Sequence, residues 1–365
     1  MGQNVRLIFR YLKNALLFLI IFLLASELSA RLFFYVRYRS PKNFLAQFGL
    51  QTNSEYGTEI IPLIRNRTLP HLATTFSTNS KGYRGKIEYG SKQPNELRIL
   101  LLGESAVFGY GATSDDTSLG PQLEKNLRAR LPDRPVSVIN TGTPGHISFQ
   151  ILRRFQLKAA EEKPDVAVFY FGWNDLFSLV SAPHPRKNIF LNEENLKARS
   201  WQEWFWLFNR RFTNNPILRP LAVSSVIYKI SDLLAIRNKK KNPAEAFYEK
   251  SRAALLKPEI TALLREQLSE NLIALSEFGR KNQIRLVGVT LFSEFDFFAE
   301  GRQIVNDILR GLAKEGRFTL LNADERVFAE SLKGINNTND YCHLTDQGNR
   351  LLAEWLAEEI LQPIR

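Results

Sequence analysis

The feature that most constrains the fold is an alternation of short apolar runs with longer helical stretches in the last two-thirds of the chain. The apolar runs have the length and the Val, Ile and Leu content of buried strands, and they cover residues 97–102, 136–139, 166–171, 284–289 and 318–321. Helices are expected at residues ~119–131, ~147–162, ~259–281, ~300–315 and ~345–361. This alternation is typical of parallel strands joined by right-handed crossovers, with helices on both faces of the sheet. It predicts an α/β fold, a three-layer α/β/α sandwich around a five-stranded parallel sheet.

Two segments lie outside this alternation. Residues 39–95 contain several Pro and Gly residues between short β-like pieces, which predicts an irregular, β-rich cap or linker with a hairpin near residues 75–89. The α/β domain then spans residues 96–365. A long segment at ~176–258 interrupts this domain after its third strand, and we expect a helical insertion there.

The N-terminus resembles a signal anchor. Basic residues precede an uncharged apolar run at residues 14–26, and further apolar residues follow it. We interpret residues 1–38 as a tail and signal anchor with a single transmembrane helix at ~12–34. The signal-like arrangement places the rest of the chain outside the cytoplasm, although basic residues on both sides of the run leave the orientation open. A cleaved signal peptide ending near Ala30 and a buried core helix remain the alternatives.

The charge balance favours some partners and excludes others. The chain has 49 Lys and Arg residues against 37 Asp and Glu residues, so its net charge of +12 favours anionic surroundings such as lipid headgroups or acidic glycans. It contains no nucleic-acid-recognition signature, and its His and Cys residues lack the spacing of zinc ligands. We therefore expect neither nucleic acid binding nor a metal site. The single cysteine, Cys342, excludes an intrachain disulfide.

Polar residues follow the first three predicted strands. Ser105 stands in a glycine-flanked turn after the first strand, residues 140–145 form a Gly-rich turn after the second, and Asn174 follows the third. The carboxyl ends of parallel strands meet at one edge of a sheet, where ligands bind in folds of this class. Taken singly, each of these residues is also explained as a helix cap or a turn residue.

A fourth polar segment stands near the C-terminus, just before the last predicted helix. Asp340 precedes His343 by three residues, a spacing that places both on one loop or helical turn. A carboxylate in that position can orient an imidazole and stabilise its protonated form, which suits the imidazole to act as a general base.

Together, these four segments resemble the four sequence blocks of the SGNH or GDSL hydrolase family, in the family's order. They cover residues 103–105, 140–145, 172–175 and 340–343, and the resemblance extends over about residues 96–361. It implies a flavodoxin-like fold and a serine esterase activity that requires no metal or organic cofactor. One position departs from the family pattern, since Glu104 stands where an Asp is usual. That Asp is not the acid of the catalytic triad.

The resemblance also implies a role for each site residue. Ser105 would be the nucleophile and His343 the general base, with Asp340 orienting the imidazole. The backbone N–H groups of Ser105 and Gly145 and the side-chain amide of Asn174 would form the oxyanion hole.

Three functions remain open at this point. The first is a membrane-anchored esterase that acts on acylated extracytoplasmic glycans, lipids or small molecules through an acyl-enzyme. The second is an O-acyltransferase that uses the same triad with a sugar hydroxyl in place of water. The third is a non-catalytic glycan-binding protein that retains the fold. We expect the first.

Overall fold

The computed structural model describes the chain over residues 3–38, 45–46, 48–69, 72–181, 187–188, 257–295, 298–337 and 342–362. It divides into two compact units. The first comprises residues 1–44 and 197–246, and the second comprises residues 45–196 and 247–365. The predicted helical insertion at ~176–258 lies mostly outside the described residues.

Helix α1 (Gln3–Tyr38) is the described part of the first unit and is 36 residues long. From Tyr11 to Leu24, its large apolar side chains are 45–73% exposed. Among the helices of the described residues, none combines the length and apolar character needed to cross a membrane. The prediction of a transmembrane helix at ~12–34 is therefore not confirmed. The uncharged run at residues 14–26 is itself shorter than the about 20 apolar residues that a span normally needs.

The second unit is built on a five-stranded parallel sheet with the strand order β6-β5-β7-β8-β9. Its strands are β5 (Leu97–Gly103), β6 (Val136–Asn140), β7 (Val166–Tyr170), β8 (Arg285–Val289) and β9 (Thr319–Leu321). Numbered along the chain, this is the flavodoxin-like order 2-1-3-4-5. The central strands β5 and β7 are buried at every residue, as their continuous apolar sequence predicts. The predicted α/β fold and its five strands are confirmed.

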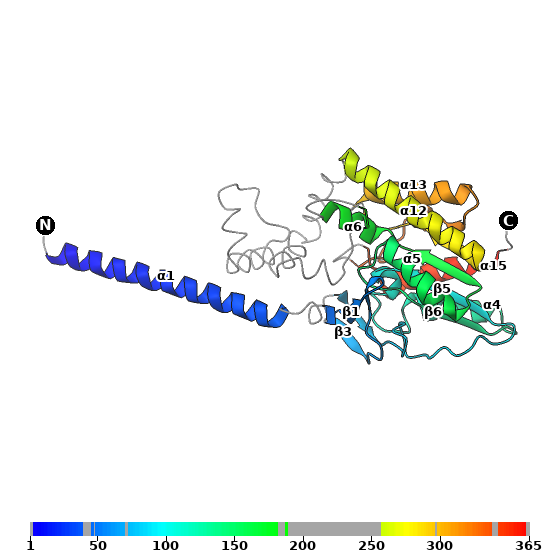
Figure 1. Cartoon of the computed structure of the whole chain (residues 1–365), viewed down its shortest axis with the longest axis horizontal. Coiled ribbons are helices and arrows are strands. Elements are labelled where there is room, and N and C mark those ends of the chain that lie inside the picture. The colour runs from blue at the N-terminus through cyan, green and yellow to red at the C-terminus, as the bar shows by residue number, and fades with distance from the viewer. Residues whose placement is uncertain are drawn as a thin grey trace. The chain divides into compact units, whose positions relative to one another are not determined.

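Helices cover both faces of the sheet. On one face, α4 (Leu119–Arg130) packs against the last helix, α15 (Asp346–Leu361). On the other, α12 (Pro258–Lys281) packs against α5 (Ser148–Leu157) and α13 (Ala299–Lys314) (Figure 1). The crossovers from β5 to β6 and from β6 to β7 run in opposite directions along the sheet. Because both are right-handed, α4 and α5 must lie on opposite faces.

Local signals explain where these helices begin and end. Helix α12 starts with Pro258 at its first position and carries Arg280 and Lys281 in its last turn, where cations interact favourably with the helix dipole. Thr345 caps α15, because its hydroxyl accepts a hydrogen bond from the Gly348 N–H at 3.2 Å. The short helix α14 (Ala323–Ala329) was not predicted, since seven residues hold too few turns for a periodic pattern.

The segment before the sheet forms two antiparallel pairs. Strand β1 (Leu50–Asn53) pairs with β2 (Gly57–Ile60), and β3 (Arg67–Leu69) pairs with β4 (Thr74–Phe76). The hairpin expected near residues 75–89 is reduced to a single antiparallel bridge between Thr78 and Arg84. Residues 45–95 belong to the same compact unit as the sheet.

Candidate active site

Ser105 occupies the first position of a one-turn helix at the carboxyl end of β5. This helix, α3 (Ser105–Phe108), ends at Gly109, which has the left-handed backbone angle φ 94°. The end of β5 lies very close to α3 and to β7. A Cβ atom at Gly103 would lie 2.3 Å from Val107 Cγ2 and 2.5 Å from the Tyr170 carbonyl oxygen. Only glycine fits there, so the residue before the turn is set by packing. The turn presents a half-buried Ser105 at the top of the sheet.

His343 is brought to Ser105 across 238 residues of sequence. Its Nε2 lies 2.8 Å from Ser105 Oγ, which is hydrogen-bonding distance for a nucleophile and its base. The Tyr110 ring meets the imidazole edge to face, with ring centroids 5.7 Å apart. The Asn337 N–H donates to the His343 carbonyl at 2.8 Å and holds the loop in place. Asp340, the predicted third member of the triad, lies outside the described residues.

The two glycines of the turn after β6 have different surroundings. A Cβ atom at Gly142 would lie 2.4 Å from the Phe108 nitrogen, so this glycine is required for close packing against α3. Gly145 is exposed and has φ 79°, and its N–H donates no backbone hydrogen bond within the described part of the chain. Of the two, Gly145 is the one whose N–H is available to a ligand.

Asn174 lies in the first turn of α6 (Trp173–Ser181), directly after β7. Its Nδ2 donates to the His146 carbonyl at 3.0 Å, which links the turn after β7 to the turn after β6. A primary amide carries two N–H groups, so the second remains as a donor for a bound oxyanion. The blocks after β5, β6 and β7 therefore meet at the carboxyl edge of the sheet.

Glu104, the residue that departs from the family pattern, connects the block after β5 to the block after β7. Its carboxylate accepts hydrogen bonds from the N–H groups of Gly172, Trp173 and Asn174 at 2.9–3.1 Å. A carboxylate here also faces the positive end of the α6 dipole. The Glu104 side chain, which is only 1% exposed, thus connects the turn that carries Ser105 to the start of α6.

The buried Glu104 carboxyl has an unusual protonation equilibrium. Burial and the nearby Asp175 carboxylate together raise its pKa from 4.5 to about 8, although the three N–H groups act in the opposite direction. Burial also raises the pKa of Asp175, whose carboxylate accepts hydrogen bonds from Ser148 and Gln267. The folded chain therefore holds the Glu104 proton more tightly than the unfolded chain does.

This pKa difference predicts a pH-dependent stability that Glu104→Gln should remove. The stabilising contribution of the Glu104 proton is complete below pH 4.5 and is lost as the pH rises through about 8. Between pH 5 and pH 8, the free energy of unfolding of the wild type should thus fall more steeply than that of Glu104→Gln. Urea unfolding at a series of pH values measures both slopes. Parallel slopes would contradict the raised pKa.

The segment before the sheet also holds the turn that carries Ser105 in place. Arg84, 4% exposed, donates from Nη1 to the carbonyls of Phe108 and Gly109, both at 2.9 Å. Its Nη2 donates to the carbonyls of Thr75 and Ser114. These bonds occupy the carbonyl end of α3, where a cation is favourable. Sequence reasoning missed Arg84, because a lone Arg in an irregular segment gives no local signal.

Arg84→Met should lower the free energy of unfolding by about 3 kcal/mol, because the carbonyls of Thr75, Phe108, Gly109 and Ser114 would each lose a hydrogen bond and Asp115 would lose its ion-pair partner. Urea denaturation measures the change. Arg134→Met is a matched control, since Arg134 Nε donates to one surface carbonyl, that of Asn95. The control should cost less than about 1 kcal/mol. Equal losses in the two variants would show that Arg84 does not brace the turn.

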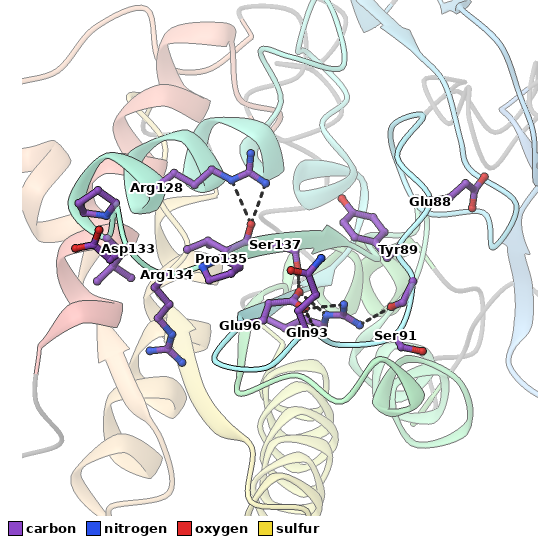
Figure 2. Close-up of a pocket in the computed structure, with 15 residues that line it drawn as sticks. Glu88, Tyr89, Ser91, Gln93, Glu96, Arg128, Asp133, Arg134, Pro135 and Ser137 are labelled. Atoms are coloured by element: carbon purple, nitrogen blue, oxygen red, sulfur yellow. Dashed lines mark hydrogen bonds and ion pairs between the residues drawn. The ribbon is translucent and has the colours of Figure 1, made fainter.

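A separate cavity of about 650 Å³ lies at the opposite end of the sheet (Figure 2). It is bordered by the first residues of β5 and β6. The ion pair between Arg98 and Glu96 in the lining of this cavity is buried, and its hydrogen bonds are made to protein groups. Arg98 donates to Glu96, which also accepts a hydrogen bond from Ser137. Ligands of parallel α/β sheets bind at the carboxyl ends of the strands, so this cavity is not the candidate site. No group of three or more His, Cys, Asp or Glu residues that could hold a metal occurs among the described residues.

Solved structures that are similar to this chain include a lipase/acylhydrolase and acetyl xylan esterases. A lipase/acylhydrolase from Enterococcus faecalis is 15% identical, with a TM-score of 0.42 over 73% of this chain and 98% of that one. An acetyl xylan esterase variant from Geobacillus stearothermophilus is 14% identical, with a TM-score of 0.43 over 76% and 98%. No curated protein matches the chain significantly.

The family assignment rests on the sequence match. The model of the GDSL-like Lipase/Acylhydrolase family matches residues 101–351, which include the turn with Ser105, the turns after β6 and β7, and His343. This match covers more than half of the chain and all five strands except the first residues of β5. The chain belongs to the GDSL-like lipase/acylhydrolase family of ester-hydrolysing enzymes.

Proposed function

We propose that Ser105, His343 and Asp340 are the catalytic triad of this esterase. The observation that carries the proposal is the 2.8 Å contact between Ser105 Oγ and His343 Nε2. His343 removes the Ser105 proton as Oγ attacks the ester carbonyl, and it then protonates the leaving alcohol. Asp340 orients the imidazole. Water, activated by His343, attacks the acyl-enzyme and releases the carboxylic acid.

The proposed oxyanion hole consists of the N–H groups of Ser105 and Gly145 and the side-chain amide of Asn174. Its support is the placement of these residues at the ends of the adjacent strands β5, β6 and β7. The N–H groups at the start of α6 donate to Glu104, and Asn174 Nδ2 donates to the His146 carbonyl, so the three turns are held in place before substrate binds. Donors fixed in advance stabilise developing charge without reorganisation during the reaction.

The proposed substrates are acyl or acetyl esters on an extracytoplasmic glycan or lipid. Two features of the chain support this. The net charge of +12 favours anionic surfaces. Helix α1 presents a continuous run of exposed Leu, Ile and Phe side chains, which is typical of segments that associate with membranes. We propose that α1 anchors the enzyme to a membrane, with the hydrolase unit outside the cytoplasm.

A fluorophosphonate probe tests the triad directly, because it phosphonylates an activated serine. The wild type should be labelled and Ser105→Ala should not. Absence of labelling in correctly folded wild type would favour the non-catalytic alternative.

A second experiment, with acylated and deacylated glycans as substrates, distinguishes ester hydrolysis from acyl transfer. Release of free acid indicates hydrolysis, whereas appearance of a newly acylated acceptor indicates transfer.

Membrane association is tested by alkaline extraction of membranes from cells that express the full chain. The wild type should stay in the membrane pellet. A variant with Leu19→Arg and Phe22→Arg, which places two charges in the exposed apolar run of α1, should be released into the supernatant. Release of the wild type under the same conditions would contradict the proposed anchor while leaving the triad proposal intact.

A further inference from the structure

One ring nitrogen of His146 is buried and has no hydrogen-bond partner among the described residues. The residue is 0% exposed, and its Nε2 lies 2.7 Å from the Thr58 carbonyl oxygen. A carbonyl only accepts hydrogen bonds, so Nε2 carries the ring proton. Burial and the nearby Arg154 lower the pKa of His146 to about 3, which keeps the imidazole neutral. Nδ1 is therefore an acceptor, and it meets no donor among the described residues.

Arg154, on α5, has a buried hydrogen-bond donor that lacks an acceptor among the described residues. It is 4% exposed, its Nη1 donates to the Thr141 carbonyl, and its guanidinium lies over the Tyr83 ring at 5.5 Å. Its Nε–H, however, finds no acceptor within the described part of the chain. A buried donor or acceptor left without a partner costs free energy, so such groups usually bond to an ordered water molecule where no protein atom is in reach.

Both side chains line the same small cavity. This cavity lies beneath the turn that carries Gly145 and is also bordered by Gly103, Thr141 and Thr143. Its volume is about 10 Å³ for a water-sized sphere, close to the smallest space that holds one water molecule. Nothing larger fits.

We propose that this cavity is a binding site for a single water molecule, which accepts a hydrogen bond from Arg154 Nε and donates one to His146 Nδ1. The chemistry of the two groups selects a neutral ligand that both accepts and donates. The lone pair on Nδ1 disfavours an anion, and the guanidinium disfavours a cation. Among neutral molecules that can both donate and accept hydrogen bonds, water is the one small enough for this cavity.

The water connects the proposed oxyanion hole to the body of the domain. His146 directly follows Gly145, and its carbonyl accepts the hydrogen bond from Asn174 Nδ2. Its ring is held on one side by Thr58 of β2. The water holds the other side to α5 through Arg154. His146 is thus a positioning residue whose two ring contacts fix both Gly145 and Asn174. The water site rests on geometry alone, whereas its kinetic effect rests on the proposed triad.

A crystal structure of the full chain, at a resolution that shows ordered solvent, tests the site. We expect one solvent peak within hydrogen-bonding distance of both His146 Nδ1 and Arg154 Nε. An empty cavity, or a rotated His146 ring whose Nδ1 contacts a protein atom, would overturn the proposal. This outcome would not affect the triad, which fluorophosphonate labelling tests separately.

His146→Gln tests the function of the water. The Gln amide can replace Nε2–H as the donor to Thr58, but it has no atom in the place of Nδ1. The solvent peak should disappear and the rate of fluorophosphonate labelling should fall about tenfold, a part of the loss that follows removal of a whole oxyanion donor. Arg154→Lys keeps the charge but replaces Nε–H by a methylene group, and it should have the same effect. Unchanged labelling in both folded variants would overturn the positioning role.

Discussion

Replacing Ser105 with alanine should lower kcat for ester hydrolysis by about 10⁵–10⁶-fold, the loss typical of a serine nucleophile removed from a triad. In the proposed mechanism the hydroxyl attacks the ester, and it lies 2.8 Å from His343 Nε2. The rest of the turn does not depend on it. Alanine keeps the Cβ atom and favours helix, so α3 and the backbone bonds that Ser105 makes to Gly109 and Tyr110 should persist.

The measurement is kcat on a chromogenic short-chain ester, together with thermal unfolding to show that the variant is folded. Ser91→Ala is the matched control, because Ser91 is exposed and borders the cavity at the opposite end of the sheet. The control should retain wild-type activity. Substantial turnover by folded Ser105→Ala would rule out the proposed nucleophile.

Asn174→Ala should lower kcat by about 10²–10³-fold, the usual cost of one oxyanion donor. The donor acts on charge that develops in the transition state, so kcat should change more than KM. The backbone N–H of residue 174 still donates to Glu104, and the start of α6 should therefore stay in place. The hydrogen bond from Nδ2 to the His146 carbonyl is lost as well, so the unfolding temperature is needed to show that the turn after β6 stays in place.

Steady-state kinetics with the same ester, and the unfolding temperature of each variant, separate chemistry from stability. Asn282→Ala is the control, since Asn282 is an exposed residue whose Nδ2 donates to a carbonyl at the end of α12. It should leave kcat unchanged. If Asn174→Ala changed KM alone, its side chain would bind substrate without stabilising the transition state.

The sequence by itself determined the architecture of the hydrolase unit. Buried parallel strands are continuous apolar runs, and amphipathic helices repeat every 3.6 residues, so both are visible locally. All five strands of the central sheet were predicted within about two residues of their observed ends. The site blocks were also visible, because each directly follows a strand or precedes the last helix, and chain order alone places strand ends at one edge.

The tertiary structure alone decided how these blocks are held together. Arg84 reaches the carbonyl end of α3, and Glu104 reaches the start of α6, over separations that no periodic pattern records. The resemblance had already selected Gly145 over Gly142, and the structure adds the physical difference, because Gly142 packs against α3 whereas Gly145 is exposed. Each of these contacts depends on where distant backbone groups lie once the sheet has formed. A local sequence pattern specifies the element and its buried face, whereas the partner of a buried polar group is set by packing across the whole domain.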